Sequence, residues 1–179
     1  MADLAKKKIS MRTSDNKVVE VDKDVAMEFI TVKSFYEDNE SSSEDTTTMP
    51  VENVHSSILE KVIDYCKKHL ELGAKARNGD APAAKEELEE FDRSFVKDNI
   101  ENGLTMRGLL LAANYLDAKE LLEFLIGEVA NHIKNKSPEY LRRYFNIIND
   151  FTDEEEQKLR SDHAWAFEGV DPDDTHPNS

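Results

Sequence analysis

Alternating apolar and polar residues near the start of the chain predict a β-hairpin. The alternation covers residues 9–13 and 19–21, with a polar tetrapeptide between the two runs. The Asp and Asn of that tetrapeptide tolerate the backbone angles of a tight turn. After the hairpin, Asp22 or Asp24 can cap a short helix, and Met49–Val51 is expected to form a short edge strand.

Apolar residues at helical spacing dominate the rest of the chain. Residues 58–66 carry an apolar stripe that predicts an amphipathic helix ending near His69. Residues 109–115 and 118–133 are apolar on more than one face, which predicts helices buried in a core. Because strands occupy the first third of the chain and helices the remainder, we expect an α+β fold.

Three polar segments interrupt this pattern. Residues 37–48 are acidic and rich in Ser and Thr, residues 72–87 contain Gly and Pro, and residues 169–179 are rich in Asp and Pro. Segments of this composition bury little apolar surface. We therefore predict flexible acidic insertions at 37–48 and 72–87 and a disordered tail over 169–179.

The region before the tail combines helix starts with large side chains. Ser137 and Pro138 predict one helix start, and Thr152 with Glu155 forms a capping box for a last helix that reaches Phe167. These short helices carry eight large apolar side chains: Leu141, Tyr144, Phe145, Ile147, Ile148, Phe151, Trp165 and Phe167. Either they pack back on the preceding helix, or they form an open groove that a partner's helices complete.

Charge and composition restrict the class of partner. The formal net charge is −15, and both halves of the chain are acidic. Nucleic acids and anionic membrane surfaces attract basic proteins, so neither is expected as a partner. The longest apolar run, residues 109–113, is too short to span a bilayer, and no secretory signal follows the first residue.

No arrangement of reactive residues predicts an enzyme or a cofactor site. Cys66 excludes a disulfide framework, and as part of an apolar stripe it is interpreted as a packing residue rather than a nucleophile. No two of the five histidines have the spacing that holds a metal on one helix. Asp150 and Glu154 suggest a calcium loop, but Glu155 and Ser161 stand where that loop needs Gly and a bidentate Glu. We therefore predict no cofactor and no metal, in a soluble protein of a reducing compartment.

An ordered set of motifs resembles the S-phase kinase-associated protein family. The matching segments are residues 19–22, 58–69, 111–116, 137–139, 145–152, 154–156 and 165–168. Members of this family are adaptors that bridge F-box proteins to cullin in SCF ubiquitin ligases. The resemblance covers roughly residues 7–168, and the ending Trp-Ala-Phe-Glu looks like the plant branch.

The resemblance implies a BTB/POZ fold over 7–133, with a small mixed sheet on a helical core. It also implies added helices over 137–168 that bind F-box proteins, and no catalysis. The implied partners are F-box proteins and cullin directly, and a RING subunit and a ubiquitin-conjugating enzyme indirectly. The implied location is the nucleus and cytoplasm.

The resemblance further implies two binding surfaces. Asn114 and Tyr115 are expected to face cullin. The residues expected to bind the F-box are Leu122, Ile126, Val129, Leu141, Phe145, Asn146, Ile147, Asn149 and Trp165. The spacing of the first three as i, i+4 and i+7 lets them form one stripe while Leu121 and Leu125 face the core.

Some residues depart from the family pattern. Arg107 and Gly108 stand where a Phe and a Glu are usual, close to the expected cullin side, and Tyr140 stands where a Glu is usual. These departures motivate a second hypothesis, in which the protein stabilises F-box proteins without recruiting cullin.

Overall fold

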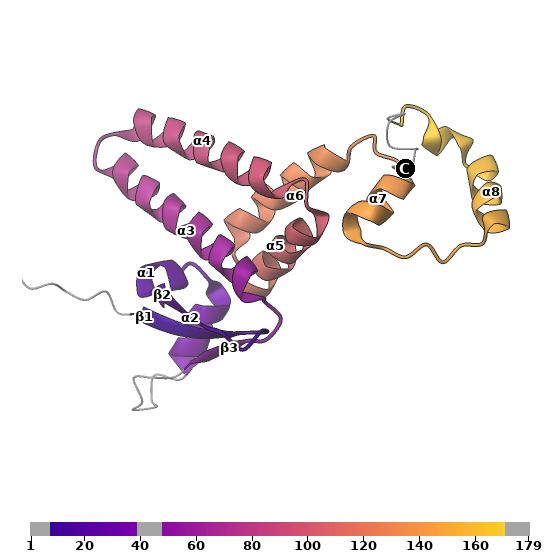
Figure 1. The fold of residues 1–179 in the computed structure, drawn as a ribbon. Coiled ribbons are helices and arrows are strands. Elements are labelled where there is room, and N and C mark those ends of the chain that lie inside the picture. The colour runs from indigo at the N-terminus through magenta and orange to yellow at the C-terminus, as the bar shows by residue number, and fades with distance from the viewer. Residues whose placement is uncertain (1–7, 39–47, 171–179) are drawn as a thin grey trace, which may run out of the picture.

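A computed structural model describes residues 8–38 and 48–170 of the chain, as one small sheet and a series of helices (Figure 1). The strands are β1 (Lys8–Thr13), β2 (Val18–Asp22) and β3 (Met49–Val51). The helices are α1 (Lys23–Ala26), α2 (Ile30–Asp38), α3 (Ser56–Arg77), α4 (Ala81–Asn99), α5 (Gly103–Leu116), α6 (Lys119–Ile133), α7 (Pro138–Phe145), α8 (Asp153–Asp162) and the 3-10 helix η1 (Ala164–Phe167).

The sheet confirms the predicted hairpin and the predicted edge strand. β1 pairs antiparallel with β2, and Ile9 lies opposite Val21. The turn between them includes Asn16 at a φ of 60°, a backbone angle that Asn tolerates. β3 pairs in parallel with β1, and the strand order β2-β1-β3 places it at an edge. The sheet is therefore mixed, as expected.

Hydrogen bonds fasten the hairpin turn to the start of α3. The carboxylate of Asp15 accepts hydrogen bonds from the Thr13 hydroxyl at 2.7 Å, from the Ser56 hydroxyl at 2.8 Å and from the Ser56 backbone N–H at 3.0 Å. The bonds from Thr13 and then Ser56 hold the pKa of Asp15 well below its usual range. Asp15 thereby joins the sheet to the longest helix.

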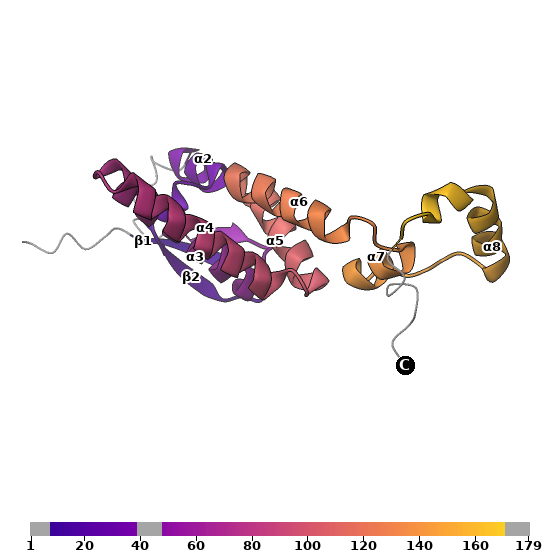
Figure 2. The same ribbon diagram turned by 90° about the horizontal axis from the view of Figure 1, so that it is seen from above.

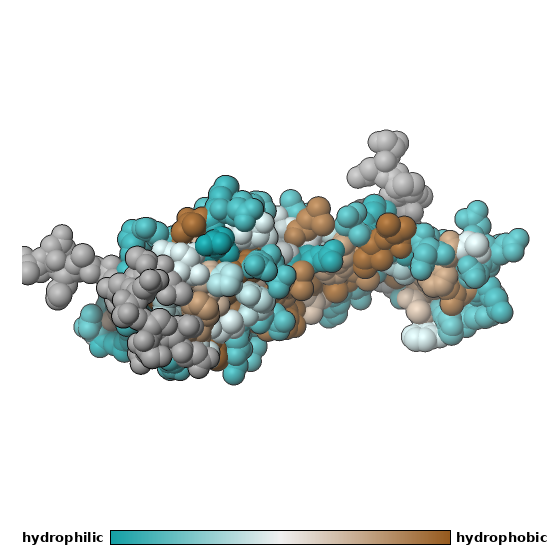
Figure 3. Space-filling model, turned by 90° about the horizontal axis from the view of Figure 1, so that it is seen from below, coloured by the Kyte–Doolittle hydropathy of each residue, from teal (hydrophilic) through white to brown (hydrophobic). Residues whose placement is uncertain are grey.

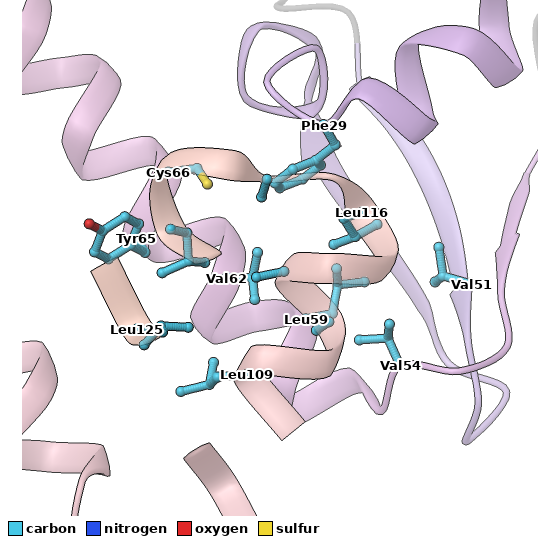
Figure 4. Close-up of a cluster of buried hydrophobic side chains, with 14 of the residues drawn as sticks. Phe29, Val51, Val54, Leu59, Val62, Tyr65, Cys66, Leu109, Leu116 and Leu125 are labelled. Carbon is cyan, nitrogen blue, oxygen red and sulfur yellow. The ribbon is translucent and has the colours of Figure 1, made fainter. Parts of the chain in front are cut away.

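The core lies between the helices α3, α5 and α6 on one side and the sheet with α1 and α2 on the other. Its side chains include Leu59 and Val62 from α3, Leu109 and Leu116 from α5, and Leu125 from α6 (Figure 4). Cys66 is buried beside them, and burial raises the pKa of its thiol to about 12. A thiol in that state is a poor nucleophile, which agrees with the packing role predicted for it.

The prediction of a flexible insertion over 72–87 is wrong, because this segment forms the bend of a helical hairpin. α3 continues past His69 to Arg77, and α4 begins at Ala81. Gly79, with a φ of 106°, makes the turn, and a Pro stands in the first turn of α4, where it is tolerated. The remaining residues of the segment are largely Ala, Glu, Lys and Leu, which favour helices.

Side-chain contacts also hold this hairpin together. Leu72 and Ala84 are both buried between its helices. The Glu87 carboxylate accepts hydrogen bonds from the ammonium groups of Lys68 and Lys75, each at 2.9 Å, which lower its pKa to about 2. The other two polar segments were predicted as a flexible insertion over 37–48 and a disordered tail over 169–179. Glu37 and Asp38 are the last residues of α2, and residues 39–47 and 171–179 lie outside the described residues, so most of both predictions is untested.

The described structure consists of a body and a C-terminal arm. The body comprises the described residues up to 133, and the C-terminal arm comprises α7, α8 and η1. In both ribbon views the arm extends away from the end of α6 (Figures 1 and 2). The last helix ends at Asp162 rather than Phe167, and η1 continues after it. Within the described residues, no helix has the length and apolar character needed to cross a membrane.

Candidate partner-binding site

α6 separates its apolar residues between the core and the surface, but not fully as predicted. Leu121 and Leu125 are buried in the core, as expected. Leu122 is half-buried and Ile126 is exposed, so both are accessible to a partner. Val129 is only 6% exposed and belongs to the buried cluster, so the prediction that it faces outward with them is wrong. The reason is geometric, since Val129 follows Leu125 by four residues and so continues the buried row of Leu121 and Leu125.

α7 begins and ends where its sequence specifies. The Ser137 hydroxyl accepts a hydrogen bond from the Tyr140 backbone N–H at 3.0 Å, which caps the helix start. Asn146 adopts a left-handed conformation with a φ of 52° and ends the helix. Leu141 and Phe145 are half-buried, and the Phe145 ring packs edge-on against Tyr144 with ring centroids 4.9 Å apart. Tyr144 itself belongs to the buried core cluster, so this helix packs partly back on the body.

Beyond α7, large apolar side chains are left uncovered. Ile147 and Phe151 are exposed, Ile148 is 86% exposed and Trp165 is 73% exposed. Seen from below, apolar residues also reach the surface between the body and the arm (Figure 3). Neither of the two alternatives for this region holds alone, because α7 packs on the body and the following segments form an open surface.

α8 starts with the predicted capping box. The Thr152 hydroxyl accepts a hydrogen bond from the Glu155 backbone N–H at 3.3 Å, and the Glu155 carboxylate accepts one from the Thr152 N–H at 2.9 Å. The bonds from Thr152 lower the pKa of Glu155. In the part of the chain that the structure describes, no three His, Cys, Asp or Glu side chains gather as metal ligands would.

Charged groups connect α8 to α7. Arg142 donates a hydrogen bond to Glu156 at 2.8 Å, and Arg160 pairs with both Glu139 and Glu156. The bond from Arg142 lowers the pKa of Glu156. Asn149, which is exposed, adds a longer bond to the same carboxylate at 3.4 Å. No residue of α8 is buried, so these charges hold the helix in place.

The expected cullin-facing residues lie at the end of α5. Asn114 is exposed and Tyr115 is half-buried. The Tyr115 carbonyl accepts a hydrogen bond from the Thr31 hydroxyl at 2.9 Å, which ties α5 to α2. α7 packs against Gly103 at the start of α5, so the arm lies at the other end of this helix from Asn114 and Tyr115 (Figure 1).

Two further apolar residues on α5 were missed by the sequence interpretation. Leu104 is 58% exposed and Leu111 is 56% exposed. Their i, i+7 spacing places them on one face, with Arg107 between them and Asn114 one turn beyond Leu111. That spacing was the available signal, but the density of apolar residues in this helix favoured complete burial.

Gly108 has a packing role where α5 meets α3. A Cβ atom at this position would lie 3.0 Å from Cδ1 and 3.1 Å from Cγ1 of Ile58. The missing side chain therefore lets α5 approach α3 closely, at a half-buried position beside the Leu104–Leu111 face. Arg107, by contrast, is exposed.

Comparison with known proteins identifies the family. The model described as "Skp1 family, tetramerisation domain", which represents a POZ domain, matches residues 7–71, and "Skp1 family, dimerisation domain" matches residues 119–166. SKP1-like protein 20 of Oryza sativa subsp. japonica is 43% identical over 172 residues, 89% of this chain and 94% of the relative.

Two further relatives support the same family assignment. SKP1-like protein 1A of Arabidopsis thaliana is 41% identical over 167 residues, 92% of this chain and all of the relative's length. The SCF ubiquitin ligase complex protein SKP1a of Dictyostelium discoideum is 40% identical over 161 residues, 88% of this chain and 94% of the relative. The predicted α+β fold of BTB/POZ type is confirmed. The chain belongs to the Skp1 family.

Proposed function

We propose that this protein is the adaptor subunit of an SCF ubiquitin ligase, and that it bridges F-box substrate receptors to cullin. Family membership supports the role, because relatives are named as subunits of that complex. The observation that carries it is the open apolar surface of the C-terminal arm, which includes Ile147, Ile148, Phe151 and Trp165. Exposed apolar groups of this size favour a protein partner.

The F-box partner would contact the arm and the exposed side of α6. Leu122 and Ile126 offer aliphatic contacts, and Leu141 and Phe145 are partly accessible beside them. Asn146 and Asn149 supply polar groups on the exposed segment after α7. Trp165 is the proposed anchor, because a large aromatic side chain that becomes buried on binding contributes strongly to affinity.

Cullin would contact the outer face of α5. Asn114 and Tyr115 supply polar groups there, and Leu104 and Leu111 supply apolar contact area. The chain then acts by position rather than by catalysis: it holds a substrate receptor at a fixed distance from cullin, and cullin carries the RING subunit and the ubiquitin-conjugating enzyme. We also propose that it works in the nucleus and cytoplasm, and that it belongs to the plant branch of the family.

A second function remains a specific competitor, in which the protein stabilises F-box proteins without recruiting cullin. The observation in its favour is Arg107, which places an exposed cation between Leu104 and Leu111. A charge in the centre of an apolar contact loses its hydration on binding. That loss weakens the binding free energy unless an acidic group of the partner pairs with the charge. Gly108 gives this alternative less support, because its missing side chain serves the packing of α5 against Ile58 of α3.

Co-purification distinguishes the two functions. The full chain is mixed with an F-box protein, with cullin, and with both, and the mass of each complex is measured by light scattering. The adaptor function predicts one complex that holds one copy of each protein. Binding of the F-box protein alone would favour the second function, and binding of neither would refute both.

A further inference from the structure

Three aromatic side chains join α7 to the end of α6. The rings of Tyr140 and Tyr144 stack with centroids 5.8 Å apart and 14° between their planes, and the His132 ring of α6 lies 5.1 Å from that of Tyr144. His132 Nε2 and the Tyr140 hydroxyl form a hydrogen bond of 2.6 Å. Tyr144 is buried, so these rings form a small packed unit rather than a surface contact.

Tyr144 also reaches the corner between α4 and α5. Its hydroxyl donates a hydrogen bond to the backbone carbonyl of Ile100 at 2.6 Å. Burial, with smaller contributions from Tyr140 and Glu101, raises the pKa of this hydroxyl to about 12, so it stays protonated as a donor at neutral pH. A single side chain of α7 thereby contacts segments that are distant in sequence.

The first residue of α5 accommodates this arrangement. A Cβ atom at Gly103 would lie 1.7 Å from the Tyr144 carbonyl oxygen and 2.5 Å from its carbon. Both atoms belong to the backbone, so no rotamer change would relieve such a clash. Glycine is the residue that lets α7 sit against the start of α5.

The other connections of α7 are less well packed. The link from α6 runs over residues 134–136, which are exposed or half-buried, and includes Asn135 in a left-handed conformation with a φ of 62°. On the far side, α8 is attached through partly exposed ion pairs, which water and salt weaken. The orientation of α7 on the body therefore depends on the aromatic unit and on Gly103.

We propose that His132, Tyr140, Tyr144 and Gly103 are positioning residues, which hold α7 in its binding orientation on the body before any partner arrives. The inference rests on the proposed function, since α7 carries part of the F-box-binding surface. A surface formed in advance spares the partner the cost of ordering it. The same docking fixes the direction in which the bound receptor points away from the body.

Gly103→Ala tests this proposal, with Gly73→Ala as its matched control. Both replace a glycine in a helix, but a Cβ atom at Gly73 of α3 has no neighbour within 4 Å. Hydrogen exchange of the full chain should show α7 amides protected in the wild type and in Gly73→Ala. In Gly103→Ala they should exchange about tenfold faster, while the amides of α3 and α6 keep their protection.

Binding to an F-box protein provides the functional readout. If the docked population of α7 falls to about one tenth, the apparent affinity falls about tenfold. Tyr144→Phe, which keeps the ring and removes the bond to Ile100, should give a smaller loss of the same kind, and it carries the test if Gly103→Ala fails to fold. Cullin binding should not change in Tyr144→Phe, because that variant leaves α5 with Leu104, Asn114 and Tyr115 unaltered.

Several outcomes would overturn the proposal. One is an α7 that exchanges as fast in the wild type as in Gly103→Ala. Another is an α7 loosened by Gly103→Ala or Tyr144→Phe while F-box affinity stays at the wild-type value. Failure of the proposed function looks different, because then the wild type itself binds no F-box protein even though exchange shows α7 docked.

Discussion

Trp165 combines the largest apolar side chain of the arm with an exposed fraction of 73%. Its neighbours in η1 and α8 are not buried either, so the residue supports no core in the free chain. Trp165→Ala should therefore leave the melting temperature nearly unchanged. It should cost about 2 kcal/mol or more of F-box binding, as buried interface tryptophans do.

Calorimetric titration with an F-box protein, paired with thermal unfolding, measures both quantities for Trp165→Ala. Tryptophan fluorescence of the wild type should also shift to the blue as the indole leaves water. A variant that unfolds several degrees early and binds normally would place the residue in the core and contradict its role as an anchor.

At the other end of the molecule, Asp15 should make stability depend on pH. The hydrogen bonds from Thr13 and Ser56 lower its pKa in the folded state below the ordinary value of 3.8. A lowered pKa means that the carboxylate stabilises the fold above about pH 4, and that this contribution disappears as the pH falls through the folded-state value. Asp15→Asn should therefore be less stable than the wild type at pH 7.

Urea unfolding at a series of pH values checks this prediction. The difference between Asp15→Asn and the wild type should shrink below about pH 4, where Asp15 of the unfolded chain becomes protonated while the folded carboxylate stays ionised. Asp98→Asn, on an exposed position of α4, serves as the control. A difference between Asp15→Asn and the wild type that stays constant from pH 7 to pH 3 would show that Asp15 acts by its shape rather than its charge.

Among the elements, the α3–α4 hairpin shows what the sequence pattern missed. The hairpin of β1 and β2 and the capping box at Thr152 could be predicted, because each depends on residues close together in the sequence. The helices over 72–87 were not predicted because glycine commonly marks a loop, although of Gly73 and Gly79 only Gly79 has a positive φ. The helix propensity of the intervening Ala, Lys and Arg residues outweighs one glycine.

The candidate site, too, could be predicted from the sequence only in part. The excess of apolar residues on short helices left open whether Ile147 and Trp165 are buried or exposed, and the structure shows both exposed. The burial of Val129 had a local signal, its position four residues after Leu125, whereas the close approach of Gly103 to Tyr144 joins distant elements and has none. Local patterns identified the helices of the arm, and tertiary packing decided which of their side chains stay exposed.

Gly73 provides a test of the hairpin as an element. It lies within α3, and a Cβ atom there would have no neighbour within 4 Å. Gly73→Ala should raise the free energy of unfolding by about 0.5–1 kcal/mol, because alanine loses less backbone entropy in a helix. Gly79→Ala should do the opposite, since its φ of 106° strains any residue with a side chain.

Chemical denaturation of both glycine variants measures these changes. If Gly73→Ala and Gly79→Ala left stability equally unchanged, residues 72–87 would be a flexible segment after all. A loss of stability in Gly73→Ala would instead show that the position is more crowded than the structure indicates.

For the whole molecule, the position of Asn114 and Tyr115 at the far end of α5 from α7 predicts that the two partners can be lost independently. Asn114→Lys combined with Tyr115→Lys places two cations at the end of α5, where they should prevent cullin contact by bulk and charge. F-box affinity should remain within about threefold of the wild type, because the arm is remote from these positions. Trp165→Ala is the complementary variant, with F-box binding weakened and cullin binding kept.

Surface-immobilised cullin and F-box protein, each titrated with the same variants, provide this comparison. Circular dichroism confirms that each variant is folded before it is titrated. Loss of both partners in the folded α5 variant would mean that the two surfaces are coupled or shared, and the arrangement of separate ends would be wrong.

The adaptor account makes its central claim about simultaneous binding, and the most direct measurement is the mass of the complex formed by the full chain, an F-box protein and cullin in solution. Analytical ultracentrifugation should show a single species with one copy of each, and no complex of cullin with the F-box protein when this chain is left out. Two separate binary complexes that never combine, or a cullin–F-box complex that forms equally well without the chain, would contradict the account.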